Sequence, residues 1–184
     1  MSIQIYILSK LTEGENYPYK LKKELSEPIP FDKMGNLTES KLYYHFESLT
    51  KQGLVEPREI IKEENRPDKQ VFAITDKGRE QLPNKIYELF EKAKNISEMV
   101  VGIMFLRHVE KTKVIPILEK KLELLQGKQQ QLQAIYSQIE IDDTMREKVD
   151  FVESYFSENI ANEIKWLEKL IRKMKDIKAW SNFP

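Results

Sequence analysis

Hydrophobic side chains recur at helical spacing along most of the 184-residue chain, but the period changes over residues 54–74. Valine, isoleucine and phenylalanine there favour two short strands, from Leu54 to Ile61 and from Gln70 to Ile74. The polar segment KEENRPDK between the strands contains a proline and suits the tip of a β-hairpin. The pattern therefore predicts a mostly helical protein with a single hairpin.

Three helices are predicted before this hairpin. Apolar residues from Ile3 to Leu11 indicate the first, and Pro18 suits the start of the second because proline lacks the N–H that a first turn leaves unpaired. Thr38 is an N-cap candidate for the third helix, and Gly53 can end it in the left-handed conformation. Its inward stripe is formed by Leu42, Phe46 and Leu49. Three helices followed by a hairpin is the order of a winged helix-turn-helix, whose third helix enters the DNA major groove.

Long helices are predicted for the rest of the chain. Thr75 and Asp76 restart helix after the hairpin, and Pro83 lies near the start of a long helix that extends to Met104. A further helix begins at residues 112–113, and its apolar residues alternate four and three apart, as in a coiled coil. The last helix is capped by Asp142 or Asp143 and pairs with the helix before it as an antiparallel hairpin.

A helical hairpin of this kind cannot bury both of its faces alone, so the sequence predicts a partner helix for it. We expect a mostly α fold with two domains. These are a winged helix-turn-helix DNA-binding domain with a two-stranded wing over residues 1–82 and a long-helix dimerisation and effector domain over residues 83–184. The residues expected at the dimer interface are Val100, Ile160, Ile164, Leu167 and Ile171.

Composition excludes several classes of function. The chain has no cysteine, and His45 and His108 lie far apart, so we expect no metal site and no cofactor. No phosphate-binding loop or nucleophile–base pair indicates an enzyme. The longest apolar run, Met99 to Leu106, is shorter than the roughly 20 residues of a membrane-spanning helix. The start lacks the basic leader of a secretory signal, so we expect a cytoplasmic protein with no membrane partner.

Two segments of the first domain resemble a known family. SKLYYHFESLTKQGLVEPRE, followed by NRPDKQVFAITDKGREQL, is similar in order and spacing to the PadR transcriptional regulators. The Tyr17-Pro18-Tyr19 segment resembles the family's start of the second helix, and IKWLEKLIRK resembles a segment of the last helix in its longer members. The resemblance covers about residues 5–82. It implies a homodimeric, ligand-responsive repressor that binds a palindromic operator in double-stranded DNA.

The resemblance also implies which side chains meet DNA. The residues expected there are Tyr19, Ser40, Lys41, Tyr43, Tyr44, His45, Lys62, Arg66 and Lys69. Ser40, Lys41 and Tyr44 would face the groove, and the hydroxyls of Tyr19 and Tyr43 would meet phosphates. Because 30 basic and 30 acidic residues cancel, any DNA-binding surface must be local.

Other functions remain open from the sequence. The residues expected around a small apolar or aromatic effector are Phe90, Met99, Met104, Phe105 and Trp166, and core packing is the competing explanation for each. The wing cations could simply solvate the hairpin tip. Two alternatives to a repressor are a winged-helix module that docks another protein and a ligand-sensing scaffold without sequence-specific DNA binding.

Overall fold

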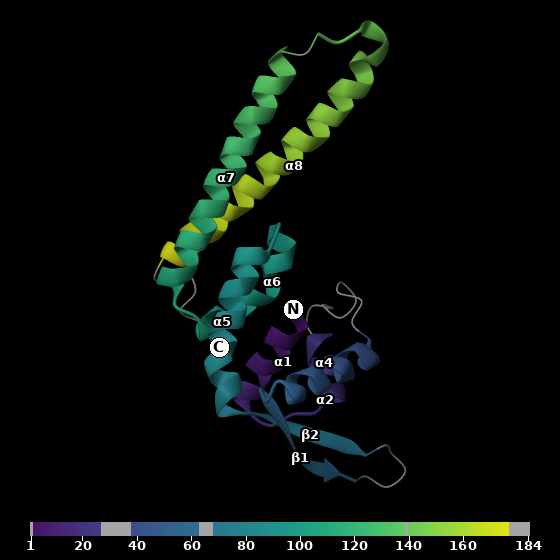
Figure 1. The fold of residues 1–184 in the computed structure, drawn as a ribbon, viewed down its shortest axis with the longest axis vertical. Helices are drawn as coiled ribbons and strands as arrows, with labels where there is room; N and C mark the ends of the chain where they lie inside the picture. The colour runs from purple at the N-terminus through teal and green to yellow at the C-terminus, as the bar shows by residue number, and fades with distance from the viewer. Residues whose placement is uncertain (1, 27–37, 63–67, 139, 177–184) are drawn as a thin grey trace. The chain divides into compact units, whose positions relative to one another are not determined.

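The structure is a computed structural model, mostly helical with one antiparallel two-stranded sheet (Figure 1). The residues that it describes are 2–26, 38–62, 68–138 and 140–176. This architecture confirms the predicted fold class. The chain divides into two compact units, which are described separately: unit 1 comprises residues 1–89 and 98–109, and unit 2 comprises residues 90–97 and 110–184.

Unit 1 begins with the three predicted helices, α1 (Ser2–Glu13), α2 (Pro18–Leu25) and α4 (Glu39–Lys51). Pro18 is the first residue of α2, as expected. The Tyr6 hydroxyl donates a hydrogen bond of 2.8 Å to the Leu21 carbonyl and thereby ties α1 to α2. The Thr38 hydroxyl accepts a hydrogen bond from the backbone N–H of Lys41 at 3.3 Å, which confirms the predicted N-cap of α4.

The hairpin follows α4 as predicted, with β1 (Val55–Ile61) pairing antiparallel with β2 (Lys69–Ile74). The register shifts between Pro57 and Ile60, where an irregularity interrupts the ladder. On the other side of β2, Asn16 exchanges two backbone hydrogen bonds with Phe72, at 3.0 and 2.8 Å. The segment between α1 and α2 is thus attached to the sheet.

The long helix expected from Pro83 to Met104 is instead two helices, α5 (Asp76–Lys92) and α6 (Ile96–Met104), followed by a short 3-10 helix, η1 (Leu106–His108). Side chains distant in sequence bind the junction between α5 and α6. The Lys121 ammonium donates to the carbonyls of Glu91 and Ala93, at 2.7 and 2.8 Å. The Glu163 carboxylate accepts from the Ile96 N–H at 3.1 Å. These contacts satisfy backbone groups that a continuous helix would have paired internally.

Because α5 runs uninterrupted through residue 82, the predicted domain boundary lies inside a helix. Unit 1 also includes residues 98–109, so packing divides the chain differently from the sequence pattern. The functional division at residue 82 stays a prediction.

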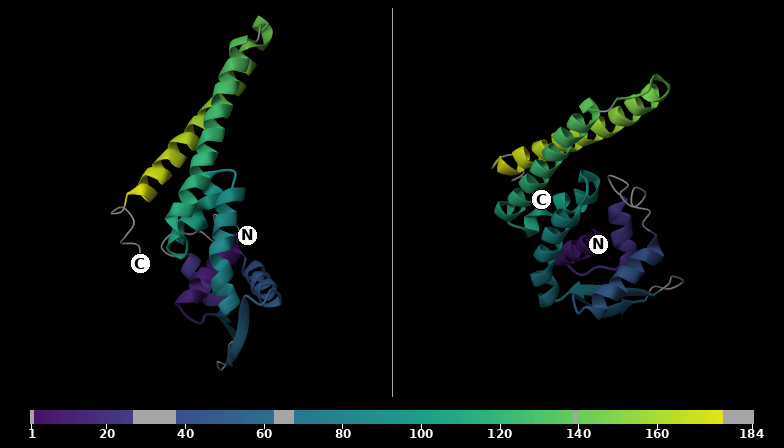
Figure 2. Two further views of the ribbon diagram at one scale, coloured as in Figure 1. Left: turned by 60° about the vertical axis from the view of Figure 1, so that its left-hand side comes forward. Right: turned by 45° about the horizontal axis from the view of Figure 1, so that its top comes forward.

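Unit 2 is dominated by two long antiparallel helices, α7 (Lys111–Gln138) and α8 (Asp143–Lys175), which we call the arm (Figure 2). The Asp142 side chain caps α8 by accepting from the Thr144 N–H at 2.8 Å, as the sequence predicted. Within the described residues, no helix is long and apolar enough to cross a membrane. Those same residues contain no group of three or more acidic or histidine side chains placed to hold a metal ion.

Candidate nucleic-acid interface

Helix α4 separates its apolar residues from its polar residues cleanly. Leu42, Phe46 and Leu49 are at most 1% exposed and anchor the helix in the core of unit 1. Burial of each such side chain contributes about 1.5–3 kcal/mol. The anchor therefore leaves the opposite side of α4 free to carry other chemistry, and Ser40 and Tyr44, four residues apart, lie together on that side.

Two tyrosines dominate the outward side of α4. Tyr44 is 67% exposed and Tyr43 is 39% exposed, so both hydroxyls can meet a partner outside the chain. Burial of part of the Tyr43 ring, and then the nearby Glu39 carboxylate, raise the pKa of Tyr43 above its usual value. Tyr43 therefore stays protonated at neutral pH and can donate a hydrogen bond to a phosphate oxygen. Lys41 is also exposed on this side.

His45 is only half-buried, and its imidazole Nδ1 is buried with no hydrogen-bond partner among the described residues. Burial lowers the pKa of His45 below the usual value for histidine. The ring is therefore neutral at neutral pH and offers no positive charge to DNA. Its ring centroid lies 5.5 Å from that of Tyr44 in an edge-on arrangement, so His45 is placed to hold the Tyr44 ring.

The other expected contact residues come from α2 and the hairpin. Tyr19, the second residue of α2, is 56% exposed. Lys62 is exposed directly after β1, whereas Lys69 is half-buried, with its ammonium 5.3 Å from the centre of the Tyr17 ring. Arg66 lies outside the described residues. Tyr19, Lys62 and the α4 residues other than His45 are therefore surface groups of unit 1, and Lys69 is partly engaged within the chain.

The C-terminal end of α4 is held tightly against the start of α5. Gly53 ends α4 with a φ of 69°, a conformation that favours glycine. The Thr75 hydroxyl donates to the Gly53 carbonyl at 2.8 Å and accepts from the Gly78 N–H at 3.0 Å. A Cβ at Gly78 would collide with the Leu54 carbonyl oxygen, so glycine is required for this close approach. The orientation of α4 is thus coupled directly to that of α5.

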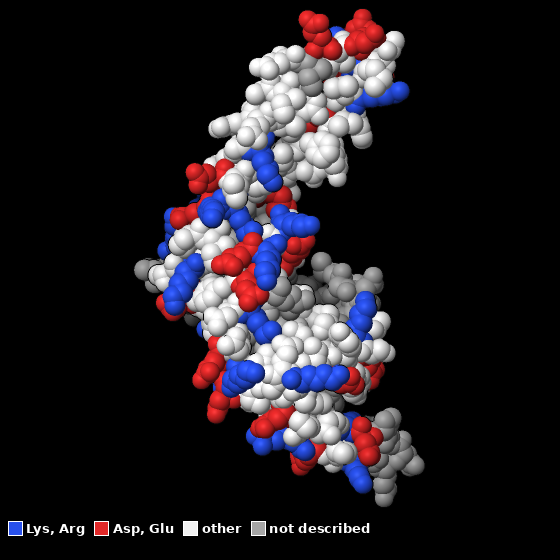
Figure 3. All heavy atoms as spheres, viewed as in Figure 1, with Lys and Arg blue, Asp and Glu red and all other residues white. Residues whose placement is uncertain are grey.

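Charges of both signs are interspersed on the face of unit 1 drawn in Figure 3. Glu39 and Glu47 belong to α4 itself, and the Arg58 guanidinium pairs with Glu56 at 2.7 Å on β1. This mixture agrees with the cancelling charges of the whole chain. Favourable electrostatics toward DNA must therefore come from a few placed cations.

The residues expected around an effector are divided between the two units. In unit 1, Met99 and Phe105 are buried and Met104 is 43% exposed, with the Phe105 ring centroid 6.0 Å from that of Tyr6. In unit 2, Phe90 is fully buried, and Trp166 is 44% exposed with the Lys169 ammonium 4.2 Å above its ring. A hollow in unit 2 is lined by different residues: Glu91, Pro116, Ile117, Lys120, Lys121 and Leu124.

The residues expected at the dimer interface differ in exposure. Leu167 and Ile171 are already buried within the single chain, at 2% and 7% exposed, whereas Val100, Ile160 and Ile164 are half-buried. The large exposed apolar side chains of the arm include Leu124 and Trp166, together with a group toward its other end: Ile135, Phe151, Val152, Tyr155 and Phe156. The arm in Figure 3 carries a broad uncharged surface.

Sequence reasoning missed Phe151 and Tyr155, which are 74% and 59% exposed. They are four residues apart, and they lie directly beside the predicted stripe residues Val152 and Phe156, which have the same spacing. Together these two pairs form an apolar surface that is wider than one partner helix can cover. The width of this surface could have indicated an additional interface from the sequence.

Comparison with known proteins finds a family match over the first part of the chain. The model of the transcriptional regulator PadR-like family matches residues 7–84. No curated protein matches the chain significantly.

Among solved structures, Bacillus subtilis PadR in complex with operator DNA is 19% identical, with 95% of this chain and 100% of that chain covered and a TM-score of 0.39. A PadR-like transcriptional regulator from Bacillus cereus is 18% identical, with coverage of 95% and 97% and a TM-score of 0.38. A PadR family transcription regulator from Clostridium difficile is 22% identical, with coverage of 48% and 86% and a TM-score of 0.39. At these TM-scores the structural likeness adds no argument of its own. By the match over residues 7–84, this part of the chain is similar to the transcriptional regulator PadR-like family.

Proposed function

We propose that the chain is a homodimeric transcriptional repressor that binds a palindromic operator through α4 and acts in the cytoplasm. The observation that carries the proposal is the outward side of α4, where Ser40, Lys41 and Tyr44 are exposed while the apolar stripe is buried. Neutral hydroxyl donors and one cation suit contacts to base edges and phosphates. The proposal assigns no reaction and no cofactor to the chain.

Dimerisation is proposed to occur through the arm. Phe151, Tyr155 and Phe156 expose between 49% and 74% of their surface in the single chain, and large aromatic side chains of this kind anchor protein interfaces. A two-fold dimer would present two copies of α4 to one face of DNA. Half-sites about 34 Å apart, one helical turn, would then be read together.

A small apolar or aromatic effector is proposed to release the repressor from DNA. Trp166 of unit 2 supports this class of ligand because its indole ring is apolar and 44% exposed. Such a ligand can act only if it binds the DNA-free state more tightly than the DNA-bound state. The test is a thermal-shift screen of small aromatic acids and apolar compounds, followed by DNA binding in the presence of each hit.

The central experiment is selection of bound fragments from a genomic DNA pool by the full chain, followed by affinity measurements over a range of salt concentrations. We expect enrichment of a palindrome and a steep loss of affinity as salt rises, because counterions are released from the neutralised phosphates. A folded dimer that enriches no sequence would overturn the repressor assignment. Capture of a protein partner with little dependence on salt would favour a protein-docking module instead.

A further inference from the structure

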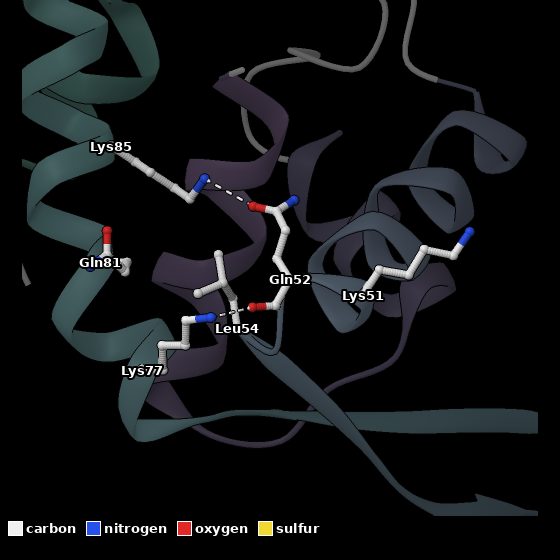
Figure 4. Close-up of a pocket in the computed structure, with 6 residues that line it drawn as sticks. All are labelled: Lys51, Gln52, Leu54, Lys77, Gln81 and Lys85. Carbon is white, nitrogen blue, oxygen red and sulfur yellow. Dashed lines mark hydrogen bonds between the residues drawn. The ribbon is translucent and has the colours of Figure 1, made fainter.

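A group of cations lies at the C-terminal end of α4. Lys51 and Gln52 occupy the end of α4, and Lys77, Gln81 and Lys85 lie four residues apart on one side of α5. Together with Leu54 they line a hollow of about 380 Å³ (Figure 4). We call Lys51, Lys77 and Lys85 the basic cluster. None of these lysines belonged to the surface predicted from the sequence.

The lysines of α5 converge on Gln52. The Lys77 ammonium donates to the backbone carbonyl of Gln52 at 2.8 Å, and the Lys85 ammonium donates to the side-chain oxygen of Gln52 at 3.4 Å. Lys77 therefore stabilises the carbonyl end of α4, where the helix dipole favours a cation. Helix capping explains Lys77, but it does not explain Lys85 or Lys51. In Figure 4, Lys51 extends from the other side of Gln52, away from α5.

The hollow contains no acidic side chain. Among the described residues, none of the three lysines forms an ion pair with a carboxylate. Elsewhere in unit 1, Lys10 lies 2.6 Å from Glu13 and 3.1 Å from Glu24. Each ammonium has three N–H donors, so Lys77 and Lys85 retain donors beyond the bond that each makes to Gln52. Three cations without a carboxylate in the hollow form a local positive site on a surface of mixed charge.

The cluster also continues the outward side of α4. Ser40, Tyr44, Glu47 and Lys51 follow one another at intervals of four, three and four residues, so they share one face of the helix. The 13 residues of α4 extend about 20 Å. The major groove is only about 12 Å wide. If the first turns of α4 read bases, its last turn therefore reaches the phosphate backbone at the edge of the groove.

We propose that the basic cluster binds a backbone phosphate of the DNA on which α4 sits. This inference rests on the proposed DNA-binding function. It adds a DNA contact to those expected from the first turns of α4 and from the wing. Lys85 donates to the phosphate at the hollow, Lys51 adds positive charge from the other side of Gln52, and Lys77 holds the end of α4 in place between them. The contact raises affinity for DNA of any sequence, because phosphates carry no base information.

The test uses the full chain and a DNA fragment that it selects. Lys85→Gln and Lys51→Gln are compared with Arg79→Gln, which removes one exposed cation from a different side of α5. Lys77→Gln is avoided because loss of the cap would destabilise α4. For each cluster variant we expect weaker binding to selected and random duplexes alike. The slope of log affinity against log salt should become shallower by about 0.9 per lost phosphate contact, while Arg79→Gln leaves the slope unchanged.

A fragment in which single phosphates are replaced by neutral methylphosphonates identifies the contact. When the phosphate bound by the cluster is the one replaced, Lys85→Gln and the unmodified protein should bind the fragment with the same affinity. The inference would be overturned if the slope of log affinity against log salt were the same for Lys85→Gln and Lys51→Gln as for Arg79→Gln. The DNA-binding function would then remain intact. Binding of inorganic phosphate that requires Lys85, with DNA binding unaffected, would also overturn it, in favour of a small-anion site. Failure of the unmodified protein to bind any DNA would instead overturn the proposed function itself.

Discussion

Tyr44 is the most exposed of the three tyrosines expected to contact DNA, and it tests that expectation most directly. We predict that Tyr44→Ala lowers affinity for the selected operator about tenfold, in the range of about 1–3 kcal/mol for one base contact. Random duplex should lose much less. Fluorescence anisotropy on both duplexes measures the difference, and Tyr44→Phe separates the hydroxyl from the ring. Equal losses on both duplexes would assign Tyr44 to the backbone instead.

His45 gives a prediction about pH. Because burial lowers the pKa of His45 in the folded chain, the unfolded chain, with a histidine pKa of about 6.5, takes up the proton first as pH falls. Stability is therefore full above about pH 6.5 and decreases as pH falls toward the lower folded pKa. Denaturant unfolding from about pH 8 to about pH 5 should show this loss.

His45→Gln should make that loss of stability smaller. His108 has its pKa lowered by burial and by Arg107, so His108→Gln should reduce the loss independently. A pH dependence unchanged in His45→Gln would show that the half-buried ring accepts a proton without cost.

At the level of elements, the junction between α4 and α5 depends on one glycine. Gly78→Ala would place a methyl group against the Leu54 carbonyl and the Ile74 side chain, so we predict a loss of about 1–3 kcal/mol in stability. Gly127→Ala in α7 is the matched control, because nothing lies within 4 Å of the added Cβ. That substitution should stabilise the helix by about 0.5–1 kcal/mol. Thermal unfolding of both variants provides the comparison, and equal effects would contradict the close packing at Gly78.

Local signals account for the elements that the sequence predicted correctly. Thr38, Gly53 and the alternation of the strands each act within a few residues, so α4 and the hairpin could be located from the sequence alone. The break between α5 and α6 could not, because the partners of its backbone groups, Lys121 and Glu163, come from distant parts of the chain.

The candidate site divides in the same way. The outward placement of Tyr43 and Tyr44 follows from helical spacing around a buried stripe, so the sequence indicated it. The basic cluster joins Lys51 to Lys77 and Lys85 across the intervening hairpin, and only the folded chain brings them together. The sequence also placed Leu167 and Ile171 at a subunit interface, and that placement stays a prediction. Both are buried within the single chain, and periodicity cannot distinguish a partner helix of the same chain from one of another chain.

At the level of the whole molecule, two substitutions in α8 distinguish assembly from folding. Phe151→Asp changes a side chain that is 74% exposed, so we predict that the chain stays folded and the dimer dissociates. Leu167→Asp places a charge where only 2% of the side chain is exposed, so we predict loss of the folded arm. Light scattering gives the oligomeric state and circular dichroism gives the helix content.

If Phe151→Asp still forms a dimer, the exposed end of the arm is not part of the subunit interface. If Leu167→Asp is folded but monomeric, the interface lies at the residues expected from the sequence. Phe151→Leu provides the conservative control, since it keeps an apolar side chain at the same position.

Unit 1 is discontinuous along the chain, and this has a consequence for synthesis. The Tyr6 ring packs near that of Phe105, and Glu13 pairs with Arg107, so the first helix is completed by residues almost a hundred positions later. Domains generally fold as units while the ribosome extends the chain from the N-terminus. The nascent winged helix therefore leaves the ribosome with part of its core uncovered. It cannot acquire its full stability until residues 98–109 have also emerged.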